Sequence, residues 1–132
     1  MGLFDWIKSK NKASAKLAGG RGWTFDVVGE SAFKHNLARI VGGKTQAGHG
    51  FKCEASLVHD VRNTSDPNAV VVLINGYPVA YLDRVRAAEY RGAIAAQSAV
   101  CGAKIVGGWD NGGGDEGSFG VKLNIKWPPQ IA

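Results

Sequence analysis

The sequence is poor in the residues that build metal centres and disulfides. It contains two cysteines and three histidines, and Cys53 and Cys101 lie far apart in the chain. Neither the paired C-x-x-C spacing nor an H-x-x-x-H spacing occurs. Because zinc sites and redox pairs depend on such spacings, we predict no metal site and no cofactor.

The sequence also lacks a long apolar run and the common catalytic motifs. No stretch reaches the roughly 18 consecutive apolar residues of a membrane-spanning helix. The first lysines follow the apolar start of the chain instead of preceding it, which is the wrong order for a secretory signal, so we expect a cytoplasmic protein. Neither G-x-S-x-G nor H-E-x-x-H is present. We therefore predict a protein that is not an enzyme, with no catalytic residues.

One stretch resembles a phosphate-binding loop. Gly42-Gly43-Lys44-Thr45 matches the end of that motif. Such a loop must lead directly into a helix whose N-terminus faces the phosphates, whereas the glycine-containing residues 46–50 are poor helix formers. Nucleotide hydrolysis is therefore not expected.

Positive charge is scarce outside the N-terminal segment. The formal net charge is +5, and residues 1–22 carry four of these charges through Lys8, Lys10, Lys12, Lys16 and Arg21 against Asp5. Residues 23–132 are close to neutral. Proteins that hold many phosphates usually carry a concentrated basic face, so we expect few phosphate contacts.

The N-terminal segment has the pattern of an amphipathic helix. Leu3, Phe4 and Ile7 approximate one helical face over residues 1–18, and Gly19-Gly20 ends it. We divide the chain into this basic helix with its glycine-rich joint, residues 1–22, and one domain, residues 23–132. Three placements of the helix stay open: against the domain, against a second copy in a homo-oligomer, or free as a basic arm.

The remainder of the chain reads as short strands with one inserted helix. Nineteen glycines point to many tight turns, and Asn75-Gly76 is the preferred two-residue hairpin turn. Asp83 is expected to cap a helix over 83–98. Strands are predicted at 23–27, 37–41, 51–59, 69–74, 77–82, 103–106 and 119–127. This order is typical of a mainly β (α+β) fold, a small, partly open β-barrel of the OB or SH3-like kind.

The most specific signal lies in the loop before the hairpin. Arg62-Asn63-x-x-Asp66-Pro67-Asn68-Ala69-Val70, followed by the Asn-Gly turn and Val79-Ala80-Tyr81-Leu82, closely resembles the signature of the HIRAN family. Val27-Val28-Gly29 and the strand at Phe119 also stand where that family has them. The resemblance covers about residues 24–127.

The resemblance implies a function as well as a fold. HIRAN domains attached to DNA-repair helicases fold as OB-like barrels and hold the 3′ end of single-stranded DNA. By motif position, Asp66 would accept the terminal hydroxyl with Asn63 beside it, while Arg84 takes a basic position and Phe119 a stacking one. The other positions implied for the binding site are Tyr81, Arg62 and Phe33, the nearest ring after Gly29. We therefore predict a non-enzymatic module that binds single-stranded DNA weakly but with sensitivity to its 3′ end.

Two alternatives stay open at this point. Asp66 and Asn68 are also residues that brace a turn through local hydrogen bonds. A module of the same fold could instead serve protein interaction or assembly, with the N-terminal helix and the loop around Trp109 as its contact surfaces.

Overall fold

We analysed a computed structural model of the chain, which describes residues 15–96 and 98–132. Seven strands form one sheet, and three short helices pack beside it. The strands are β1 (Ala15–Lys16), β2 (Phe25–Asp26), β3 (His49–His59), β4 (Val70–Ile74), β5 (Tyr77–Tyr81), β6 (Ser98–Gly107) and β7 (Phe119–Asn124). The helices are η1 (Glu30–Phe33), α2 (Lys34–Val41) and α3 (Arg84–Ala93).

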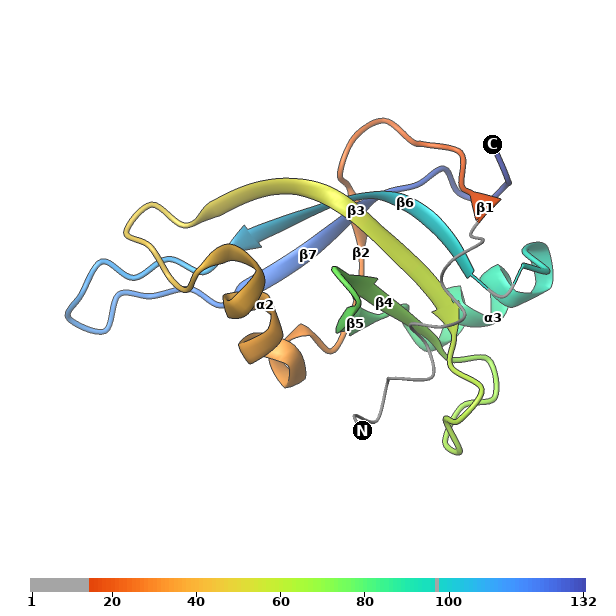
Figure 1. The fold of residues 1–132 in the computed structure, drawn as a ribbon, viewed down its shortest axis with the longest axis horizontal. Coiled ribbons are helices and arrows are strands. Elements are labelled where there is room, and N and C mark those ends of the chain that lie inside the picture. The colour runs from red at the N-terminus through yellow and green to blue at the C-terminus, as the bar shows by residue number, and fades with distance from the viewer. Residues whose placement is uncertain (1–14, 97) are drawn as a thin grey trace.

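The sheet curls into a half-barrel (Figure 1). Its strand order is β2-β7-β6-β3-β4-β5, with all these pairs antiparallel, and β1 adds to β6 in parallel. Val28, two residues after β2, exchanges two backbone hydrogen bonds of 2.8 Å with Tyr81 at the end of β5. The two ends of the strand order therefore meet at this pair. The prediction of a mainly β fold with helices is confirmed.

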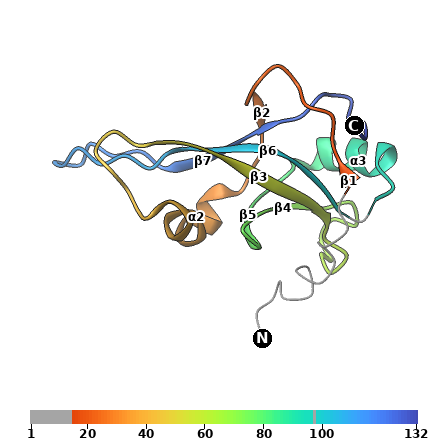
Figure 2. The same cartoon turned by 45° about the horizontal axis from the view of Figure 1, so that its top comes forward.

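The apolar core fills the inner face of the curled sheet. Fully buried side chains from four strands meet there, namely Leu57, Val72, Ile105 and Leu123, together with Leu37 of α2 and Tyr90 of α3. Figure 2 shows α2 beneath the long strands and α3 at the opposite end, with the hairpin between β6 and β7 projecting beyond the sheet. A second, smaller buried cluster consists of Val58, Val71 and Leu73, whose side chains alternate with core residues along β3 and β4.

The prediction of a strand at 37–41 is wrong, because these residues form the last part of α2. Leu37, Ile40 and Val41 have the spacing of one helical face, and all three pack in the core. The β-branched pair Ile40-Val41 favours a strand locally. Burial of one helical face outweighs that preference here.

The helix predicted over 83–98 begins where expected but ends earlier. The Asp83 carboxylate accepts the Arg86 N–H at 2.8 Å, as a helix N-cap does. The helix stops at Ala93, because Ile94 is extended and turns its side chain into the core. Residues 98–102, expected as helix and stop, instead form the first half of β6.

Other predicted elements are confirmed within a few residues. Asn75 and Gly76 both have positive φ, 53° and 78°, and join β4 to β5 as the hairpin turn requires. The final strand ends at Asn124, before residue 127. The expected N-terminal helix falls mainly on residues 1–14, which lie outside the described residues, and the next two residues, Ala15 and Lys16, belong to β1.

Candidate functional site

The loop between β3 and β4 is held in shape by its own polar side chains. Asn63 Oδ1 accepts the backbone N–H groups of Ser65 and Asp66, both at 2.9 Å. Asp66 Oδ1 accepts the N–H of Asn68 at 3.0 Å. The turn-bracing role considered for Asp66 is therefore present, and Asn63 has the same role. One oxygen of Asp66, Oδ2, is not used by this bracing.

The remaining oxygen of Asp66 faces Arg84, the first residue of α3. Arg84 Nε lies 4.0 Å from Asp66 Oδ2, and Arg84 Nη2 lies 3.4 Å from the Ser65 carbonyl oxygen. The Asp66 side chain is 17% exposed and that of Arg84 is 74% exposed. A half-buried acceptor and an exposed cation thus stand side by side at the protein surface. This pairing can receive a hydroxyl and a neighbouring phosphate.

Tyr81 contacts both Asp60, at the base of this loop, and the ring of Phe33. Its hydroxyl donates a 2.9 Å hydrogen bond to Oδ2 of buried Asp60, whose other oxygen accepts the Arg62 N–H. Burial, followed by the hydrogen bond to Asp60 and the negative charge of that carboxylate, raises the Tyr81 pKa above its ordinary value. The ring of Tyr81 lies 6.1 Å from that of Phe33, centroid to centroid and tilted by 38°. Two partly exposed rings therefore lie next to the braced loop.

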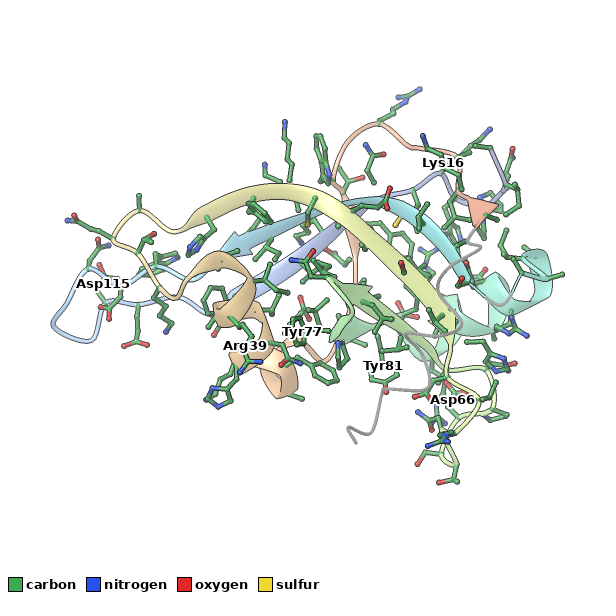
Figure 3. The ribbon with its side chains drawn as sticks, viewed as in Figure 1. Lys16, Arg39, Asp66, Tyr77, Tyr81 and Asp115 are labelled. Carbon is green, nitrogen blue, oxygen red and sulfur yellow. The ribbon has the colours of Figure 1, made fainter. Side chains whose placement is uncertain are left out.

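The structure brings together six of the seven predicted site residues. Asn63, Asp66 and Arg62 come from one loop, while Tyr81 ends β5, Arg84 starts α3 and Phe33 ends η1. Figure 3 shows Tyr81 and Asp66 on the same side of the molecule, below the long strand β3. Arg62 contributes its backbone N–H to Asp60, and the residue is exposed. We name the set Phe33, Asp60, Asn63, Asp66, Tyr81 and Arg84 the loop site.

Phe119, the seventh predicted residue, lies elsewhere. Its ring is 5.7 Å from that of His49, and it lines a hollow of about 460 Å³ with residues of η1, α2 and the β6–β7 hairpin. The other lining residues are Glu30, Ser31, Lys34, His35, Ala38, Lys44, Glu116 and Ser118. Helix η1 contacts both β5 and β7, so its two ends serve different places: Phe33 at the loop site and Ser31 at this hollow.

Asp60 is the one member of the loop site that the sequence reasoning missed. It is 6% exposed, and its backbone and side chain both hold the loop, through hydrogen bonds from Asn63 N, Arg62 N and the Tyr81 hydroxyl. A carboxylate directly after an alternating strand was the available signal. The partner that makes it part of the site, Tyr81, is distant in the sequence and adjacent only in the fold.

The loop around Trp109 is less available as a contact surface than its composition indicates. The Trp109 ring packs so closely on Gly117 and Gly48 that a Cβ at either position would lie 2.3 Å and 3.2 Å from Trp109 atoms. Much of this ring is thus occupied by the hairpin itself.

Comparisons with protein-family models, with curated proteins and with solved structures gave no match. Within residues 15–96 and 98–132 no group of three or more histidine, cysteine, aspartate or glutamate side chains is arranged to hold a metal ion. In the same part of the chain, no helix has the length and apolar character needed to cross a membrane.

Proposed function

We propose that this chain is a HIRAN-like module that binds the 3′ end of single-stranded DNA at the loop site. The observation that carries the proposal is the position of the Asp66 carboxylate, 4.0 Å from the Arg84 guanidinium and beside a loop anchored to the Phe33–Tyr81 ring pair. The sequence motif supplies the family resemblance, and the fold supplies this grouping.

Each group in the loop site matches one part of a strand end. The Asp66 oxygen that faces Arg84 can accept a hydrogen bond from a terminal 3′-hydroxyl, while the exposed guanidinium can meet the adjacent phosphate. The rings of Phe33 and Tyr81 offer faces on which bases stack, at about 1–3 kcal/mol per base. A blocked 3′ end has no hydroxyl to donate and adds bulk or charge beside the carboxylate.

The small number of cations at the loop site predicts that the affinity for single-stranded DNA falls only slightly as the salt concentration rises. Among the described residues, Arg84 is the one cation that forms an ion pair with Asp66. Each phosphate neutralised on a single strand contributes about 0.7 to the slope of log K against log salt. We therefore expect weak binding that depends on the end more than on the length of the strand.

The test is a fluorescence-anisotropy titration of the full chain at low salt. The probes are dye-labelled single strands of one sequence that carry either a free 3′-hydroxyl or a 3′-phosphate. We expect tighter binding to the free end. Equal affinity for both probes would show that Asp66 does not recognise the 3′-hydroxyl. No affinity for either probe would reject DNA binding and favour the alternative of a protein-interaction or assembly module.

A further inference from the structure

The outer face of β3, β6 and β7 carries a row of lysines that are far apart in the sequence and adjacent in the sheet. Lys52, Lys104 and Lys122 lie in three strands that are distant in the sequence, and the strand register places them as direct partners, Lys52 opposite Lys104 and Lys104 opposite Lys122. They alternate with buried core residues such as Ala103 and Leu123, so they point away from the core. Like charges on directly opposed strand positions destabilise a sheet. Repulsion within the row therefore opposes folding, and contacts with Trp23 and Asp26 act against it.

Glycine precedes each lysine by two positions, on the same face of its strand. These glycines are Gly50, Gly102 and Gly120. Gly50 lies against the Lys104 stem, where a Cβ would come within 3.4 Å of Cε. Glycine inside a strand weakens it, and often marks a place where another backbone approaches closely. Side chains from neighbouring positions pack over two of these glycines, since a Cβ at Gly102 would lie 3.7 Å from Trp23 Nε1 and one at Gly120 would lie 3.2 Å from Val106 Cγ2.

The indole ring of Trp23 makes cation–π contacts with two of the three lysine ammonium groups. Lys52 Nζ lies 4.4 Å and Lys104 Nζ 5.9 Å from the centroid of its indole ring. Lys122 forms an ion pair with Asp26 of β2. An ion pair and cation–π contacts hold the row in place while leaving the Lys52 residue exposed.

The face gathers the positive charge of the folded part. Lys16 and Arg21 border it, since Lys16 lies beside Glu54 and Asn124, and the residue before Arg21, Gly20, donates its N–H to Asn124 Oδ1. With the three lysines, and against Asp26 and Glu54, this face carries a net charge of +3. All described residues together contain thirteen lysines and arginines and ten acidic residues, which is also +3. The rest of the described surface is neutral in sum.

We propose that this lysine face binds the sugar–phosphate backbone of duplex DNA that adjoins the bound strand end, an inference that rests on the proposed function for the choice of DNA. Neighbouring strands are about 4.8 Å apart, so the row spans roughly 10 Å. One strand of a duplex presents a phosphate about every 3.4 Å along the helix axis, or about three over that span. Lysines are point charges without a fixed donor geometry, which suits contacts that read no sequence. The three lysines are distinct from the residues of the loop site, so the two surfaces can be tested separately.

The experiment uses the full chain and a DNA dumbbell, a duplex closed by a hairpin loop at each end and ligated so that it has no 3′ end. Three phosphate contacts give a slope of about −2.7 in log K against log salt, so affinity should fall about 40-fold between 50 and 200 mM salt. The variant Lys52→Gln/Lys104→Gln/Lys122→Gln should lose most of the binding and of this salt dependence. The charge-matched control Lys34→Gln/Arg39→Gln/Lys44→Gln, around α2, should retain both.

The outcomes separate this inference from the proposed function. If end preference is absent but the dumbbell binds in a manner that requires the three lysines, the proposed function fails and the lysine face stands. If end preference holds but the dumbbell does not bind, or binds equally well to the lysine variant, the lysine face is rejected alone. Lysine-dependent binding to vesicles of anionic lipid, without binding to the dumbbell, would also reject it. Cooperative thermal unfolding of each variant shows that it is folded.

Discussion

The hydroxyl of Tyr81 donates a 2.9 Å hydrogen bond to Oδ2 of Asp60, and both residues are held by the backbone around them. Tyr81 exchanges backbone hydrogen bonds with Val28, where the two ends of the strand order meet. Asp60 accepts the N–H groups of Arg62 and Asn63 at the start of the site loop. One side-chain contact therefore couples closure of the half-barrel to the shape of the loop site.

Replacing Tyr81 by phenylalanine tests that coupling. Tyr81→Phe leaves the buried Asp60 carboxylate without one of its donors, which should cost about 1–3 kcal/mol of unfolding free energy. The raised pKa of Tyr81 sets the pH dependence of this cost. Below the ordinary tyrosine pKa of about 10 the stabilisation is complete, and above it the unfolded chain ionises while the folded phenol stays neutral. The difference in stability between the wild type and Tyr81→Phe should thus shrink by about 1.4 kcal/mol per pH unit above pH 10.

The measurement is urea unfolding of both proteins between pH 7 and pH 11. Tyr90→Phe serves as the matched control, because the Tyr90 hydroxyl is buried and has no hydrogen-bond partner among the described residues. Tyr90→Phe should cost little at pH 7. A cost for Tyr81→Phe no greater than that for Tyr90→Phe would show that the contact with Asp60 contributes nothing.

Asp66→Asn should separate charge from loop bracing. The asparagine amide oxygen can still accept the Asn68 N–H, so the loop should keep its shape, but the charged acceptor for a hydroxyl is lost. We expect the preference for a free 3′-hydroxyl to fall to near unity in the anisotropy titration. Arg84→Ala should instead weaken binding to free and blocked strands equally, because it removes a phosphate contact. A free-end preference that survives Asp66→Asn would place the hydroxyl elsewhere.

Phe33→Ala should weaken binding of all single strands. Loss of one stacking face costs about 1–3 kcal/mol, or roughly 5-fold to 150-fold in affinity. Phe119→Ala is the informative comparison, since Phe119 lies at the hollow beside His49 and α2. If the strand occupies only the loop site, Phe119→Ala should leave the affinity within about 3-fold of the wild type. A loss of affinity equal to that of Phe33→Ala would indicate that the bound DNA strand extends past η1 into that hollow.

Deletion of residues 1–14 separates the two docked placements of the N-terminal segment, against the domain or against a second copy, from a free basic arm. Burying side chains such as Leu3, Phe4 and Ile7 contributes about 1.5–3 kcal/mol each, so the shortened chain should melt at a lower temperature or change its oligomeric mass. Differential scanning calorimetry and light scattering measure the two quantities. If both are unchanged, the segment is a free basic arm.

Local sequence patterns determined the hairpin and the loop. Asn75-Gly76 favours positive φ at both positions, Val70 to Ile74 form a continuous β-branched and aliphatic run, and Asp83 is a strong N-cap, so each element follows from a few adjacent residues. Turn bracing by Asp66 was also predictable, because a short polar side chain can bond to a backbone group two positions away. The same role for Asn63 was not predicted, since the sequence identified that residue only through the family resemblance.

Where packing outweighs the local backbone preference, the secondary structure could not be predicted from adjacent residues alone. Residues 37–41 favour a strand by composition but bury a helical face, and residues 98–102 follow a helix but complete β6 beside β3. In both places the free energy of burying apolar surface exceeds the small intrinsic preferences of the backbone.

Tertiary structure alone decided which distant side chains meet. Phe33, Tyr81 and Arg84 are separate residues in the sequence. Only the fold brings Tyr81 to Asp60, Phe33 to the ring of Tyr81, and Arg84 to Asp66. The residues after position 22 look almost neutral as a string, yet antiparallel register aligns Lys52, Lys104 and Lys122 in one row. Charge density on a surface depends on strand pairing across long sequence separations, and that pairing is fixed by the burial of the opposite face.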